Sequence, residues 1–150
     1  MGTVQNHDID VLNGLISASL DSAIGFETAA RGASDADRQV LEQRAVERRR
    51  IRMVLQDMVR SLGVEPVDRG SLRSAAARAI LRVKSDIAGI DGIGQHLDAA
   101  EERLHAELMA AAEDATLSVR TRNAIHTALR LTETGHVGPP PLGGGSMAVH

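Results

Sequence analysis

Glu102 and His105 are the residues of this sequence whose types and spacing suggest chemistry most directly. They lie three apart within LDAAEERLHAEL, residues 97–108, and Glu101 stands beside them. Di-metal centres in helical bundles take one Glu from each of two helices and a Glu-x-x-His pair from each of the other two. Carboxylate oxygens and imidazole nitrogens suit iron and manganese. The pair therefore predicts one part of a di-iron site, provided that it lies on a helix and points inward.

The apolar stripe of the same segment sets the direction of these side chains. Its leucines recur at helical spacing, at Leu97, Leu104 and Leu108. Steps of four and three place Glu101 on this stripe, whereas Glu102 and His105 fall toward its edge. Glu101 is therefore the acidic residue of this segment that we expect to face the interior.

Two further carboxylates are expected to turn inward from other helices. Glu27 follows the apolar Ala23 by four residues, and Glu47 precedes Ile51 by four. The residue three beyond Glu47 is Arg50 rather than His. A guanidinium group offers only donors, so it cannot ligate a metal and it repels a cation. The second Glu-x-x-His pair is thus missing at this position.

His126 lies near the apolar stripe of the last helix and completes the candidate set. The candidate metal ligands are Glu27, Glu47, Glu101, Glu102, His105 and His126. The alternative is that these residues are solvated charges at the margins of the helices, paired with neighbours such as Arg44 and Arg48. Three carboxylates in one interior repel one another unless they are protonated, paired with Arg48 or bound to a cation. The cofactor is therefore either none or a di-iron centre.

Composition and charge exclude several other classes of protein. The chain has 150 residues and no Cys, which excludes disulfides, thiolate zinc sites and iron–sulfur clusters. Phe26 is its single aromatic residue, so stacking platforms for single-stranded nucleic acid are absent. The arginine-rich stretch RAVERRRIR, residues 44–52, is typical of a solvated helix face with ion pairs. The net charge of the chain is −3, which gives no overall attraction to nucleic acid. We expect no nucleic-acid partner, and in the absence of a Gly-x-Ser-x-Gly elbow we assign no catalytic residue.

Helical periodicity runs through most of the chain. Apolar stripes predict long helices over residues 8–31, 35–62, 93–114 and from 116 or 118 to 134. Gly32 and Ser34 make a very short turn between the first two helices, so these should run antiparallel. Gly63 and Pro66 end the second helix. The connection 63–92 is too long for a turn, and we expect it to contain a helix near residues 71–88.

Four amphipathic helices bury their stripes most economically in one four-helix bundle. We expect this bundle over residues 8–134, between a flexible N-terminus at 1–7 and a disordered Pro/Gly-rich tail at 135–150. A long middle connection with its own helix is typical of ferritin-like bundles. The predicted fold class is therefore all-α, a ferritin-like four-helix bundle with a helical crossover between the second and third long helices.

Four stretches carry a likeness to a known family: LNGLISASLDSAIGF, RAVERRRIRMVLQDMVRSLGVEP, GSLRSAAARAIL and DAAEERLHAEL. Over residues 11–132 the sequence resembles a bacterial ferritin-like four-helix-bundle family of unknown function. The resemblance implies the bundle and a bacterial, stress-associated context. It implies no reaction.

These observations lead to an expected function and location. The N-terminus lacks a basic region followed by an apolar core, and no stretch approaches about 18 apolar residues, so we expect a cytoplasmic protein without a membrane segment. The expected function is non-enzymatic, by self-association or by binding a protein partner, in bacterial stress adaptation. Residual apolar surface, at Val40, Leu41 and Val54 or on the face of the crossover helix, is the expected contact of a homo-oligomer. The alternative is a carboxylate-bridged di-iron binding protein or oxidase.

Overall fold

The part of the chain that the structure describes is built from four long helices, as the sequence predicted. The computed structural model describes residues 2–68 and 90–136, with side chains described for 5–68 and 97–133, and these parts contain no strand. The helices are α1 (Gly2–Arg31), α2 (Asp35–Ser61), α4 (Ile90–Ala112) and α5 (Val119–His136). The prediction of an all-α four-helix bundle is confirmed.

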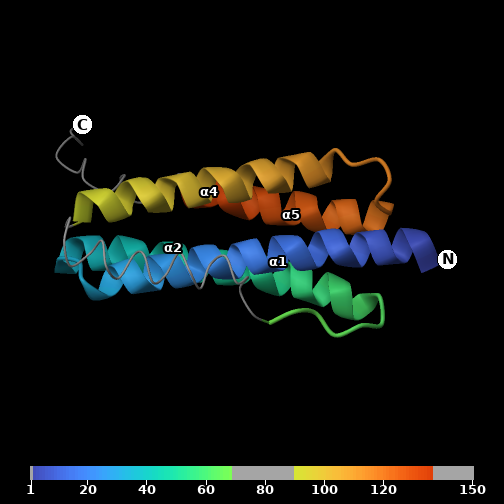
Figure 1. Cartoon of the computed structure of the whole chain (residues 1–150), viewed down its shortest axis with the longest axis horizontal. Helices are drawn as coiled ribbons and strands as arrows, with labels where there is room; N and C mark the ends of the chain where they lie inside the picture. Colours follow the sequence, from blue (N-terminus) through green and yellow to red (C-terminus); the bar gives the residue numbers. More distant parts are fainter. Residues whose placement is uncertain (1, 69–89, 137–150) are drawn as a thin grey trace.

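Each helix of the bundle packs against two others (Figure 1). Helices α1 and α5 each contact both α2 and α4, so α2 and α4 occupy opposite corners. These two run in the same direction, and α1 and α5 run in the other. A connection between two parallel helices has to return along the length of the bundle, which is the role predicted for the crossover helix near residues 71–88. That helix lies outside the described residues.

Local signals in the sequence explain where α2 begins and ends. The hydroxyl oxygen of Ser34 accepts a hydrogen bond from the backbone N–H of Asp37 at 3.4 Å, which satisfies one free donor of the first turn. Past the last turn, Gly63 has a φ of 87°, the left-handed conformation in which helices commonly end. Both residues act as the sequence predicted.

The outer ends of the first and last helices differ from those predicted. Helix α1 begins at Gly2, so residues 2–7 extend it rather than preceding it. The amide of Gln5 donates to the backbone carbonyl of Leu62 at 2.7 Å, which holds this first part of α1 against the end of α2. At the other end, α5 continues through Gly135 to His136. The remainder of the predicted tail, residues 137–150, lies outside the described residues.

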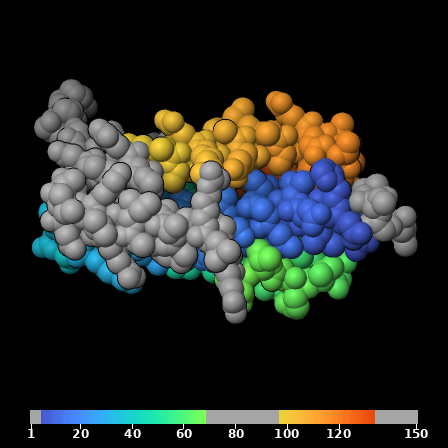
Figure 2. Space-filling view, viewed as in Figure 1, coloured from blue at the N-terminus to red at the C-terminus, as the bar shows by residue number. Residues whose placement is uncertain are grey.

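Close packing of α1 against α4 forms one wall of the bundle (Figure 2). Leu12, Ile16 and Phe26 of α1 are buried, as is Leu97 of α4. A Cβ atom added to Gly25 would lie 3.1 Å from the Cδ2 atom of Leu97. The absence of a side chain at Gly25 therefore lets the two helices approach closely.

Helix α1 is also the one helix among the described residues that would suit a membrane span by length and composition. Its stretch Gln5–Arg31 reaches a mean hydropathy of 1.2. Half of the apolar window is buried inside the bundle. Because the core helix of a soluble bundle has the same composition, this feature assigns no membrane location.

Candidate functional site: a charged network in the bundle interior

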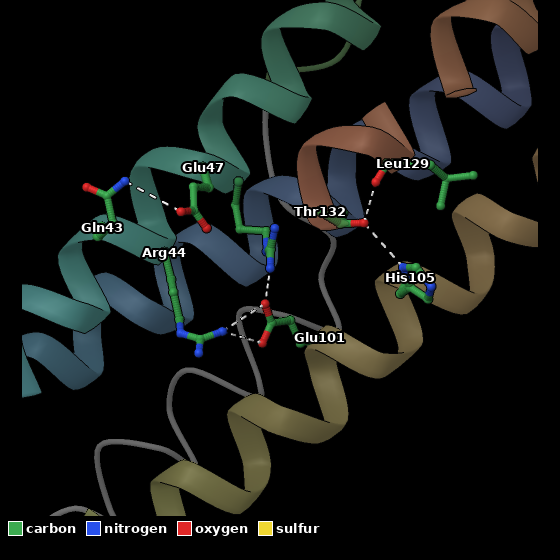
Figure 3. Close-up of polar contacts among 8 residues, drawn as sticks. Gln43, Arg44, Glu47, Glu101, His105, Leu129 and Thr132 are labelled. Carbon is green, nitrogen blue, oxygen red and sulfur yellow. Dashed lines mark hydrogen bonds and ion pairs between the residues drawn. The ribbon is translucent and has the colours of Figure 1, made fainter. Parts of the chain in front are cut away.

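A cluster of opposite charges joins α2 to α4 across the bundle. Arg44 Nη1 of α2 donates to Glu101 of α4 at 3.2 Å (Oε2) and 3.4 Å (Oε1) (Figure 3). The Nη2 atom of Arg48, one turn further along α2, also contacts Oε1 of Glu101. The side chains of Arg44 and Glu101 are 13% and 10% exposed. One carboxylate is thus held between two guanidinium groups, away from most solvent.

Arg48 is the most deeply buried charge of this network. It lies on the apolar stripe of α2 with Ala45, Ile51 and Leu55, all of which are buried, and its own exposure is 1%. Burial lowers the pKa of Arg48 from its ordinary value to about 10; the charge of Glu47 opposes this shift and the charge of Arg44 adds to it. At neutral pH Arg48 therefore remains a cation. Its Nε and Nη1 atoms have no hydrogen-bond partner among the described residues.

Glu27 makes a separate ion pair between the first two helices. The Nε and Nη2 atoms of Arg49 donate to Oε1 and Oε2 of Glu27, both at 2.8 Å, which is the bidentate arrangement of a guanidinium with a carboxylate. The two side chains are 35% and 36% exposed. Glu27 is therefore a half-exposed link between α1 and α2 and has no contact with Glu101.

Glu47 lies on α2 beside the interior charges. Its Oε1 atom accepts a hydrogen bond from Gln43 at 3.4 Å, and its buried Oε2 atom has no hydrogen-bond partner among the described residues. Glu47 nevertheless acts on the network electrostatically, because its negative charge raises the pKa of Arg48 against the effect of burial. Glu47 and Arg48 thus belong to the same group of charges.

The residues of the Glu-x-x-His pair lie on the outer side of α4. Glu102 is exposed and His105 is half-buried. The Nδ1 atom of His105 lies 3.2 Å from the hydroxyl of Thr132, which itself donates to the carbonyl oxygen of Leu129 at 2.7 Å (Figure 3). Both residues line an open groove of about 610 Å³ beside Glu133. His126, on α5, is exposed and does not line this groove.

The structure therefore does not bring the six predicted metal ligands together. Glu27, Glu47 and Glu101 each have contacts of their own, and the described residues contain no group of three or more acidic or histidine side chains that could hold a metal ion. Beside Glu101, the place that a bridging cation would need is taken by two guanidinium groups. These cannot ligate and would repel the metal. A di-iron centre does not fit this arrangement.

A second buried polar cluster was not predicted from the sequence. Asp8 of α1 is 1% exposed and accepts hydrogen bonds from the hydroxyls of Ser118 and Thr121 at 2.6 and 2.8 Å. The backbone N–H of Ser118 also donates to Asp8, at 3.2 Å. The Ser118 hydroxyl in turn caps α5 by accepting from the Thr121 N–H. The sequence had indicated only that the last helix starts at 116 or 118; Asp8 lies 110 residues away from Ser118.

Comparison with known proteins assigns the chain to a family. Residues 7–115 match a family described as a domain of unknown function, DUF2383. The chain belongs to this family. The DUF2383 match spans most of α1 and all of α2 and α4, so it includes Asp8 and the Arg44–Arg48–Glu101 network, and it ends before α5. No curated protein and no solved structure matches the chain.

Proposed function

We propose that this protein is a non-enzymatic helical bundle that acts by self-association through the solvent-facing side of α2. The observation that carries the proposal is the exposure of two large apolar side chains on that side. Val46 and Met53 lie seven residues apart, two helical turns, and are 45% and 54% exposed. Two apolar side chains on one exposed helix face provide area that a contact with a second chain would bury.

The surface differs in its residues from the one expected from the sequence. Leu41 is 2% exposed and packs in the core with Phe26, so it cannot contact a partner. Val40 and Val54 are half-buried. The proposed contact is instead the exposed stripe of α2 that contains Val46, Arg50, Met53 and Asp57. We call this stripe the α2 outer face.

The interior of the bundle is consistent with a role that needs no bound cofactor. Glu101, whose side chain is 10% exposed, is neutralised by Arg44 and Arg48. A carboxylate paired in this way stabilises the arrangement of the helices rather than offering itself to a substrate or metal. We extend the proposal to bacterial stress adaptation on the sequence likeness alone.

Light scattering coupled to size-exclusion chromatography tests self-association. We expect the apparent mass to rise above the 15.9 kDa of one chain as the concentration increases through the micromolar range. The variant Val46→Ser with Met53→Ser should shift this rise to higher concentrations. Met109→Ser is the matched control, since Met109 is 47% exposed on α4, away from the α2 outer face. A mass of one chain at every concentration would refute the proposal.

A further inference from the structure

The charges on the α2 outer face are arranged so that the face of one copy complements the same face of a second, antiparallel copy. Arg50 lies three residues before Met53, and Asp57 lies four residues after it, so all three share one side of the helix. All three are exposed. A positive charge therefore precedes the central apolar residue by one turn, and a negative charge follows it by one turn.

We infer that two copies of the chain pair antiparallel along α2, around a two-fold axis beside Met53. This inference rests on the proposed self-association and specifies its geometry. The axis brings the two Met53 side chains together and sets Arg50 of each copy level with Asp57 of the other. A two-fold contact is self-complementary by construction, so each favourable pair occurs twice.

Alternative registers along the same face are less favourable. An axis one turn nearer the N-terminus of α2 would bring Arg49 and Arg50 of the two copies together, and like charges in contact oppose association. The register centred on Met53 avoids this repulsion. It sets Val46 of each copy against the aliphatic stem of Arg60 of the other copy. Within the described part of its own chain, Asp57 pairs with Arg60 at 3.3 Å, between side chains that are 75% and 51% exposed. Such an exposed pair contributes little, so Asp57 is available to a partner.

Charge reversal with complementation tests the pairing. The variants Arg50→Asp and Asp57→Arg should each be monomeric, because each places like charges opposite one another. An equimolar mixture of the two should form a heterodimer, since every contact is again between opposite charges. The double variant Arg50→Asp with Asp57→Arg should form a homodimer. Sedimentation velocity at low salt measures all four samples against the unmodified chain, because salt screens these contacts.

A cysteine substitution gives an independent readout, because the chain has no cysteine of its own. Met53→Cys places one thiol per chain beside the two-fold axis, and we expect oxidation to yield a disulfide-linked dimer. Met109→Cys, at a position of α4 that is 47% exposed against 54% for Met53, should remain monomeric on gels under the same oxidation. Circular dichroism of every variant checks that the bundle is folded, and Arg103→Glu serves as a charge-reversal control at an exposed site on another helix.

The outcomes separate the inference from the proposed function. Recovery of dimer in the mixture together with crosslinking at Met53→Cys supports the antiparallel α2 pair. If the unmodified chain dimerises but the mixture does not recover dimer, this geometry is overturned while self-association stands. If the unmodified chain is monomeric up to several hundred micromolar, both are overturned.

Discussion

Arg48 of α2 and Glu101 of α4 contact each other across the diagonal of the bundle. Helix α2 contributes the buried guanidinium and α4 the carboxylate, which Arg44 holds from the other side. Neutralisation of Glu101 by two cations fixes the position of α4 relative to α2. The pair is therefore a structural link at the level of the bundle where a metal centre was expected.

Removal of Glu101 should strongly destabilise the protein. Glu101→Leu introduces an apolar side chain of similar size. It leaves Arg48, at 1% exposure, without its counter-charge. Breaking one side of a buried ion pair costs about 3–5 kcal/mol. Urea unfolding followed by circular dichroism measures the loss. Glu102→Gln, at the exposed neighbouring position, should change the stability by less than about 0.5 kcal/mol.

The double variant Arg48→Met with Glu101→Leu distinguishes a lost ion pair from lost packing. Because apolar residues of similar volume often replace a buried pair at no cost, we expect the double variant to recover most of the stability. A Glu101→Leu protein as stable as the unmodified one would show that Glu101 carries no structural role.

Iron binding should be weak despite the Glu-x-x-His spacing. After anaerobic loading with ferrous iron and desalting, we expect well below one iron per chain, because Arg44 and Arg48 occupy the contacts of Glu101. Elemental analysis of the desalted protein gives the ratio. Retention of two irons per chain, abolished by Glu47→Ala with Glu101→Ala, would instead support the di-iron alternative.

The sequence predicted the helices well because their determinants are local. The 3.6-residue period located the buried stripes, and Ser34 and Gly63 marked the ends of α2. The same period also predicted correctly that Glu101 faces the interior. It could not predict which groups neutralise Glu101, because these depend on which helix lies diagonally opposite and on which residues of that helix lie at the height of Glu101. At that level of the bundle, Arg44 and Arg48 of α2 lie against Glu101.

Asp8 shows more clearly what periodicity cannot supply. Asp8 precedes the buried Leu12 by four residues, so periodicity places it on the stripe of α1. It does not show what satisfies a carboxylate there, because the residues that do so begin at Ser118. A buried carboxylate is tolerated there because three donors of the α5 N-terminus satisfy it. Such a contact becomes visible only once α1 and α5 are placed at the same end of the bundle.

Substitution of Asp8 should loosen the start of α5. Asp8→Ala leaves the Ser118 and Thr121 hydroxyls and one backbone N–H without their acceptor. Hydrogen bonds to a charged group contribute about 1.5–3 kcal/mol, and we expect a loss of this size in urea unfolding. Asp10→Ala, two residues away at an exposed position of the same helix, is the matched control. Equal stability of the two variants would contradict the role assigned to Asp8.

Asp114 should make the stability depend on pH in the acid range. Hydrogen bonds from Thr116 and His7 lower the pKa of this carboxyl from 3.8 to about 2. The folded state therefore favours the ionised form, so the contribution of Asp114 is fully present above about pH 4 and is lost as the pH falls toward about 2. The difference in unfolding midpoint between the unmodified chain and Asp114→Asn should shrink over this interval.

Direct titration of Asp114 by NMR provides the decisive measurement for this pH effect. Thr116→Val removes the hydroxyl that is the largest cause of the shift, so the pKa of Asp114 should move back toward its ordinary value in this variant. A pKa of Asp114 that is the same in both proteins would rule out the assigned cause.

Two glycines on the surface should respond to alanine with opposite signs. Gly14 lies in α1, and an added Cβ would meet nothing within 4 Å, so Gly14→Ala should stabilise the protein by about 0.5–1 kcal/mol through helix propensity. Gly63 also has open space around it but holds a φ of 87°, which costs an L-residue about 1–2 kcal/mol. Gly63→Ala should therefore lower the thermal unfolding midpoint and Gly14→Ala should raise it. Shifts of the same sign would mean that α2 can end without the left-handed conformation at residue 63.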